Sequence, residues 1–139
     1  MTNRYVSKAA ISLLFGLAGC TAHSPMIVKS TTDTEQHSAK KYAPHANKVF
    51  ITESDLGPAV KYELLERIEI GKVWYGSGDD VKESLAERAR QIGADAVIQV
   101  ATWHQPSGFS WAAPHGSGKA VKILEGDLKN LPLPPGAWY

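Results

Sequence analysis

The sequence predicts a small α+β domain: a mixed β-sheet with one principal amphipathic helix, arranged as a βαβ unit followed by a hairpin. Two patterns support this prediction. Apolar residues recur at helical spacing over residues 79–92, whereas the flanking segments alternate apolar and polar residues or are continuously apolar. Clusters of Pro and Gly separate the extended segments, as expected of turns between strands.

Two extended segments precede the helix. Residues 49–51 predict a short buried strand. Residues 62–75 predict a longer strand, because Ile68, Ile70 and Trp74 share one face, expected to be buried, and mostly charged residues occupy the other. A helix over residues 60–70 is the alternative for the first half of this stretch, where the residues tolerate either structure.

The helix itself has clear start and stop signals. Asp79 and Asp80 supply an N-cap side chain and negative charge at the positive end of the helix dipole. Gly93 ends the helix as a C-cap, after about 14 residues. The apolar stripe that must face the sheet comprises Val81, Leu85, Ala89 and Ile92.

The segment after the helix predicts a central strand. Residues 96–105 are apolar on both faces, and simple alternation puts Ile98 and Val100 on one face and Val97 and Trp103 on the other. A strand that is apolar on both faces belongs in the middle of a sheet.

The remainder predicts turns, a last strand and a tail. Turns are expected at residues 106–108 and again at 114–118, leading into a strand over 119–124. Residues 127–139 are rich in proline, so this tail is expected to run extended over the surface.

The N-terminus carries a removable leader. Arg4 and Lys8 precede an apolar run that starts at Ala9 and would span roughly 15 Å as a helix, about half of a bilayer core. The run is therefore too short to remain as a transmembrane helix. It ends in Leu17-Ala18-Gly19-Cys20, which resembles the lipobox of bacterial lipoproteins.

That resemblance implies a modification and a location. It implies that residues 1–19 are a signal peptide, cleaved before Cys20, and that acyl chains such as palmitate are attached to the Cys20 sulfur and usually to its amino group. Two or three chains anchor a protein firmly. Thr21 follows the cysteine, where inner-membrane lipoproteins tend to have Asp, so in a bacterium with two membranes the resemblance implies the periplasmic face of the outer membrane.

Residues 20–46 predict a flexible linker between this anchor and a domain over residues 47–126. The stretch is poor in large apolar residues and rich in Ser, Thr, Lys and Ala, so it cannot offset its ordering entropy. As a coil it would average roughly 28 Å end to end, and it would reach about 90 Å when taut, which allows the domain to stand away from the membrane.

Charge and cysteine content limit the possible partners. Loss of residues 1–19 leaves 120 of the 139 residues and thirteen basic side chains against 14 acidic ones, a net charge of −1. This balance argues against a nucleic-acid partner, which needs clustered Lys and Arg. Cys20 is the single cysteine, so the domain is expected to fold without disulfides.

A second resemblance concerns the folded domain. Two strands, a charged helix and the turn Ile92-Gly93-Ala94-Asp95-Ala96-Val97 resemble the small α/β domain of the YbjQ-like family and of the Rcs stress-sensor lipoprotein, over roughly residues 49–124. In those proteins a similar turn returns the chain to the central strand. The cysteines that form disulfides in the Rcs sensor have no counterpart here.

Two histidines raise the alternative of a metal-binding or hydrolytic domain. His104 and His115 lie near the ends of a predicted hairpin, and Glu53 or Asp55 could complete a metal site. Their spacing is unlike a zinc signature, and the serines lack a Gly-x-Ser-x-Gly nucleophile elbow. We therefore expect no enzymatic activity, no resident metal and no cofactor.

Aromatic residues are the better candidates for function. Trp103 and Trp111 flank the same turn, and Trp138 and Tyr139 end the tail, so all four are candidate anchors at a protein interface. Simple packing in the core is the alternative for Trp103 and Trp111, and the tail could dock on its own domain instead of a partner. The sequence thus favours a non-enzymatic binding or sensing domain that contacts another envelope protein. A structural component of a larger envelope complex is a further possibility.

Overall fold

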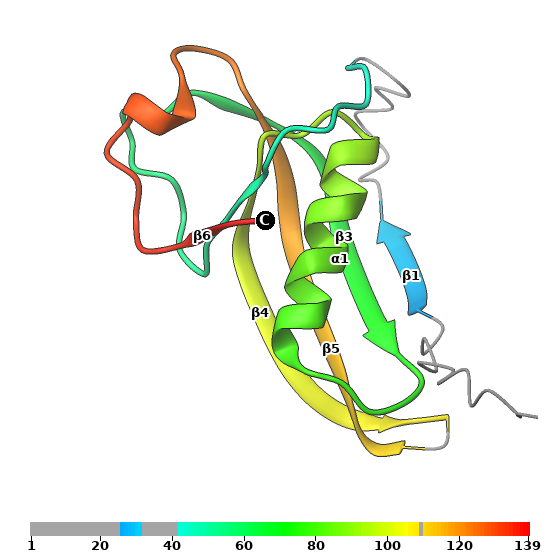
Figure 1. Ribbon diagram of the computed structural model, residues 1–139. Coiled ribbons are helices and arrows are strands. Elements are labelled where there is room, and N and C mark those ends of the chain that lie inside the picture. The colour runs from blue at the N-terminus through cyan, green and yellow to red at the C-terminus, as the bar shows by residue number, and fades with distance from the viewer. Residues whose placement is uncertain (1–25, 32–41, 109) are drawn as a thin grey trace, which may run out of the picture.

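A computed structural model describes residues 26–31, 42–108 and 110–139, so the predicted leader and Cys20 lie outside the described residues. The strands form one mixed sheet in the order β1-β3-β5-β4-β2-β6, with helix α1 across one face (Figure 1). This arrangement confirms the predicted α+β fold. The strands are β1 (Met26–Thr31), β2 (Phe50–Ile51), β3 (Tyr62–Lys72), β4 (Ala96–Ser107), β5 (Ser110–Ile123) and β6 (Ala137–Trp138), and the helices are α1 (Gly78–Gln91) and the 3-10 helix η1 (Leu128–Asn130).

Helix α1 begins one residue after its cap, Ser77. The Ser77 hydroxyl accepts a hydrogen bond from the Asp80 backbone at 3.2 Å, and the Asp80 carboxylate accepts one from the Ser77 backbone at 2.9 Å. This reciprocal pair is a capping box, so the cap predicted at Asp79 and Asp80 is corrected to Ser77, with Asp80 at the third helical position. Gly93 has a positive φ of 78°, which confirms its predicted role in ending the helix.

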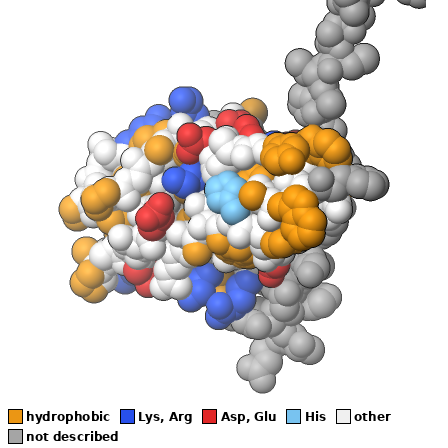
Figure 2. Space-filling model, turned by 90° about the horizontal axis from the view of Figure 1, so that it is seen from below, with side chains coloured by type: hydrophobic (Ala, Val, Ile, Leu, Met, Phe, Trp, Pro, Cys, Tyr) orange, Lys and Arg blue, Asp and Glu red, His pale blue; other side chains and the backbone are white. Residues whose placement is uncertain are grey.

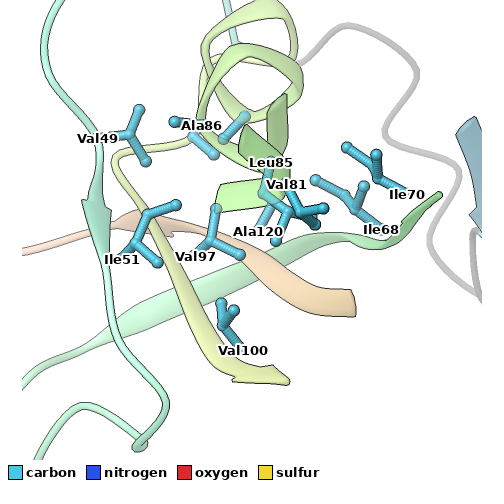
Figure 3. Packing of buried hydrophobic residues seen from close by; sticks show 12 residues of the cluster. Val49, Ile51, Ile68, Ile70, Val81, Leu85, Ala86, Val97, Val100 and Ala120 are labelled. Carbon is cyan, nitrogen blue, oxygen red and sulfur yellow. The ribbon is translucent and has the colours of Figure 1, made fainter. Parts of the chain in front are cut away.

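Helix α1 packs on the centre of the sheet, where its Val81 and Leu85 lie against apolar side chains of the strands (Figure 3). Two glycines of β5, Gly116 and Gly118, leave room for this close approach. A Cβ atom on Gly116 would lie 2.6 Å from Val81 of the helix, and one on Gly118 would lie 2.5 Å from Val97 of β4. The turn predicted at residues 114–118 is therefore wrong: these residues continue β5, and their glycines give the room that the helix side chains and β4 need. The core on this side comprises Val49, Ile51, Ile68, Ile70, Val81, Leu85, Ala86, Ala89, Ala94, Val97, Val100 and Ala120.

A charged contact also joins the helix to the sheet. Arg88 of α1 donates two hydrogen bonds, of 3.1 and 3.0 Å, to the two carboxylate oxygens of Glu66 on β3. The Glu66 side chain is 8% exposed, so it depends on this bidentate partner to offset its loss of water.

A β-bulge changes which side chains of β4 face the helix. The register of β4 on β5 shifts between Ile98 and Ala101, and Gln99 adopts a left-handed φ of 51°. Val97 and Val100 consequently join the core under α1, whereas Ile98 packs on the opposite face. The prediction that Ile98 and Val100 share a face is wrong, because the extra residue reverses the alternation.

The proline-rich tail packs onto its own domain. Residue Leu128 of η1 is buried in a second core, and β6 pairs antiparallel with β2. The Trp138 ring lies 5.3 Å from that of Phe50, and the backbones of Tyr139 and Val49 exchange two hydrogen bonds. The prediction of a tail that runs extended over the surface is only partly right, because residues 128–130 form η1 and Leu128 is buried. The tail also belongs to the domain instead of lying beyond a boundary at residue 126.

Strand β1 lies within the stretch predicted as a linker. It pairs antiparallel with β3 from Met26 opposite Lys72 to Thr31 opposite Arg67, which makes it an edge of the sheet (Figure 1). The prediction of a flexible linker over all of residues 20–46 is therefore wrong. Edge pairing depends on backbone hydrogen bonds to an open strand, which a composition argument does not detect. Within the described ranges, no helix is long and apolar enough to cross a membrane.

The packing of α1 predicts a large cost for shortening Leu85, which is fully buried. We expect Leu85→Ala to lower the free energy of unfolding by about 2–5 kcal/mol, measured by urea denaturation. The exposed Glu87→Ala on the same helix is the matched control and should change it by about 0.5 kcal/mol or less. A loss below about 1 kcal/mol for Leu85→Ala would contradict the packing described.

Candidate functional site

The face of the sheet opposite α1 is only partly covered. The second core occupies the end near β6, while residues of β3 and β4 nearer the β4–β5 turn remain exposed on this face, including Glu69, Ala101 and Gln105. We call this region the open face. It is defined, from the strand registers, by Arg67, Glu69, Gly71, Ala101, Trp103, Gln105, His115 and Ser117.

Two aromatic rings stack at the centre of the open face. Trp103 of β4 lies directly opposite His115 of β5, and their ring centroids are 6.0 Å apart with an angle of 24° between the planes. Trp103 Nε1 donates a hydrogen bond of 2.8 Å to the Gln105 side chain. His115 Nδ1 lies 3.0 Å from the Ala113 carbonyl, which can only accept, so this nitrogen carries the proton. Both rings are thus held in fixed orientations.

Gly71 makes room for the imidazole on the third strand. A Cβ atom on Gly71 would lie 2.3 Å from His115 Cδ2, so the ring occupies the place where a side chain of β3 would stand. His115 is only 7% exposed as a result, and Trp103 beside it is half-buried. The two rings form a flat, preformed aromatic surface across β3, β5 and β4.

The two histidines do not converge on one site. His104 pairs with Pro114 while Trp103 pairs with His115, and successive residues of a strand point to opposite faces. His104 therefore points to the face of α1 and His115 to the open face. Among the residues that the structure describes, no group of three or more His, Cys, Asp and Glu side chains could hold a metal ion.

The two acidic residues considered with the histidines are engaged elsewhere. Asp55 accepts hydrogen bonds from Tyr62, the first residue of β3, and from Gln99, whereas His115 pairs near the last residue of that strand. Burial, helped by the hydrogen bond to Asp55 and its negative charge, raises the pKa of Tyr62. Glu53 faces Lys82 of α1 at 3.7 Å.

A second aromatic cluster lies at the end of the sheet where the β4–β5 turn is found. Trp111 is 85% exposed, Tyr75 61% and Trp74 46%, and the rings of Trp74 and Tyr75 meet edge to face at 5.8 Å. A Cβ atom on Gly108 would lie 2.3 Å from Val73 Cγ1, so the turn packs against the residue before Trp74. Figure 2 shows hydrophobic side chains gathered to one side of this end. We call Trp74, Tyr75 and Trp111 the aromatic end.

The sequence pattern indicated Trp111 as a candidate but placed Trp74 on the buried face of a strand. The strand ends at Lys72, so its alternation does not extend to Trp74. The sequence does contain a signal for the exposure of Trp74 and Tyr75. Gly-Ser-Gly directly follows Tyr75 and indicates a turn at the end of the sheet.

The aromatic residues of the tail lie at the opposite end of the sheet. Trp138 and Tyr139 are half-buried against β2 and the segment before it, and Arg90 donates a hydrogen bond of 3.3 Å to the Tyr139 carbonyl. Trp138 also lines a cavity of about 840 Å³ with Lys48 and Lys122. The four aromatic candidates therefore separate into three places on the molecule.

A carboxylate paired with a lysine lies in the first turn of α1, close to the aromatic end. Asp80 accepts hydrogen bonds from the Ser77 backbone at 2.9 Å and from Lys72 at 3.0 Å. The Ser77 hydrogen bond, and then the Lys72 ammonium group, hold the pKa of Asp80 below its ordinary value of 3.8.

Comparisons with models of protein families, with curated proteins and with solved structures found no match to this chain. The similarities to the lipobox and to the YbjQ-like and Rcs-sensor domains therefore stay predictions, and a functional proposal rests on the motif and on the geometry described above.

The position of His115 over Gly71 predicts a steric effect. We expect Gly71→Ala to displace the imidazole from Trp103, to cost about 1–3 kcal/mol of unfolding free energy and to change the tryptophan emission. Gly57→Ala is the matched control, because a Cβ atom there meets nothing within 4 Å, and it should be neutral or slightly stabilising. Equal effects of the two changes would contradict the contact.

The lowered pKa of Asp80 predicts a pH-dependent contribution to stability. Since the folded pKa lies below the unfolded one, the contribution is present above about pH 3.8 and is lost as the pH falls through the folded value. Wild type should exceed Asp80→Asn in unfolding free energy by at most about 1 kcal/mol at pH 7, since the Asp80 carboxylate is half-exposed and screened by water, and the difference should close in acid.

The matched test repeats the comparison in a Lys72→Met background. There the difference at pH 7 should shrink, because the ammonium partner is gone. A difference that persists unchanged at the lowest pH would show that the Asp80 charge is not its source.

Proposed function

We propose that this chain is a lipid-anchored envelope lipoprotein whose domain binds another envelope protein through the open face and does not catalyse a reaction. The anchor is Cys20, and the proposed location is the periplasmic face of the outer membrane. The observation that carries the binding role is the stack of the half-buried Trp103 on the buried His115, in the part of the sheet face that the second core leaves uncovered.

The geometry of the stack favours binding. Its rings are fixed by hydrogen bonds to Gln105 and Ala113, so little conformational entropy is lost when a partner covers them. Tryptophan is enriched among the residues that dominate interface energies, and such anchors sit at the centre of a polar rim. Arg67 and Glu69 are exposed beside the stack and supply such a rim.

The lipobox supports the anchored state. A cationic head and a short apolar run are the features of a signal peptide, and here they lead into Leu17-Ala18-Gly19 directly before Cys20, which resembles a lipobox. Anchoring raises the local concentration of the open face near other envelope proteins, so that a modest affinity is sufficient for association.

Site-specific crosslinking in cells tests the partner. A photoreactive amino acid at Ala101, exposed on the open face, should give an adduct with one envelope protein, whereas the same residue at Glu87 on α1 should not. Adding Trp103→Ala should reduce the adduct about tenfold or more, because an aromatic anchor contributes on the order of 2 kcal/mol. The circular dichroism spectrum of the protein with Trp103→Ala must match that of the protein without this change, which shows that the domain is still folded.

Two outcomes would contradict the proposal separately. Equal adducts from Ala101 and Glu87, or none from Ala101, would remove the open face as a protein-binding site. An unmodified thiol at position 20, found by mass spectrometry of the protein from its native host, would remove the lipid anchor.

A further inference from the structure

We infer that the aromatic end rests in the headgroup region of the bilayer that holds the lipid on Cys20. This inference depends on the proposed lipidation and extends it, since it assigns a second membrane contact and an orientation to the domain. The occupant of the aromatic end is thus a phospholipid surface, instead of the protein partner that the sequence suggested for Trp111.

The chain between the anchor at Cys20 and the sheet is short. Strand β1 begins at Met26, so five residues separate it from Cys20. Six residue steps span at most about 20 Å when fully extended. The domain is therefore held close to the membrane, in contrast to the reach of about 90 Å expected of a linker over residues 20–46.

The chain enters the sheet at the same end as the aromatic end. Met26 pairs with Lys72, the last residue of β3, and Trp74 and Tyr75 follow two and three residues later. The β4–β5 turn packs on Val73 and brings Trp111 to the same end. Figure 1 shows β1 starting at the end of the sheet where β3 stops and β4 turns into β5. The short tether thus points the aromatic end at the bilayer.

The side chains at the aromatic end are of the kinds found at membrane interfaces. Tryptophan and tyrosine are enriched at membrane interfaces, where the ring enters the apolar boundary and the polar group stays in the headgroup layer. The Asp80 carboxylate at this end is paired with Lys72, but Asp79 is exposed beside it. An exposed carboxylate disfavours an anionic surface, so the expected lipid is zwitterionic.

The contact fixes how the domain stands. The strand registers place Trp138 level with Leu64 of β3, eight residues before Lys72 at the membrane end, so Trp138 lies roughly 26 Å above the surface. The plane of the sheet, and with it the open face, is then perpendicular to the bilayer plane. It stays accessible to a partner anchored in the same leaflet.

Fluorescence quenching in vesicles tests this orientation. The lipidated protein is reconstituted into phosphatidylcholine vesicles whose acyl chains carry bromine, using two variants in which a single tryptophan is kept and the other three are changed to phenylalanine. The emission of Trp111 should fall at least twofold relative to vesicles without bromine, whereas that of Trp138 should be unchanged. Circular dichroism must show that both variants are folded.

A further variant separates docking from tethering alone. It keeps Trp111 and the phenylalanine substitutions of Trp103 and Trp138, but carries Trp74→Ser together with Tyr75→Ser. Quenching of Trp111 should then drop by at least half, because two of three interfacial side chains are lost. Unchanged quenching would overturn the inference, since proximity through the tether would explain it.

A second readout keeps all four tryptophans. A photoreactive residue in place of Tyr75, in cells, should give an adduct with phospholipid, and an adduct with a protein or with a second copy of this chain would overturn the inference. Mass spectrometry of the same material distinguishes the two proposals. Lipidated Cys20 without quenching of Trp111 rejects only the membrane contact, whereas an unmodified Cys20 rejects the anchor on which it rests.

Discussion

The close approach of α1 and β4 to β5 is the constraint on which the rest of the structure depends. Gly116 and Gly118 leave the space that Val81 and Val97 occupy, so one helix can cover the centre of the sheet. Residues 114–118 pair with β4 on one side and with β3 on the other, so β5 continues where glycine and proline would otherwise indicate a turn. The long β4–β5 hairpin that results carries Trp103 and His115 at its centre and Trp111 near its turn.

The bulge at Gln99 determines which side chains of β4 lie on each face of the sheet. By adding one residue to β4 it turns Val100 toward the helix and leaves Ala101 and Trp103 on the opposite face. The same register places Trp103 against His115, and Gly71 on the third strand admits the imidazole. A single local irregularity therefore divides β4 into a half buried on both faces and a half whose side chains reach the open face.

The anchor and the sheet act together in the proposed function. Edge pairing of β1 leaves five residues between Cys20 and the sheet, and the same pairing starts beside the last residue of β3. A covalent lipid at one point leaves a domain free to rotate, whereas a second contact through Trp74, Tyr75 and Trp111 would orient the open face. Binding to other envelope proteins would then be restricted to one geometry.

The sequence by itself determined the class of fold, the limits of α1 to within a residue or two and the strand character of β3, because each depends on spacing or on contiguous residues. The lipobox at Cys20 is likewise read from contiguous residues and stays a prediction. Only the tertiary structure decided the pairing of β1 and β6, the continuity of β5 and the side chains that reach the open face. These features depend on backbone hydrogen bonds to distant strands, on space left by a glycine for a neighbour, and on one bulge that reverses a period of two. None of them leaves a local pattern in the chain that forms it.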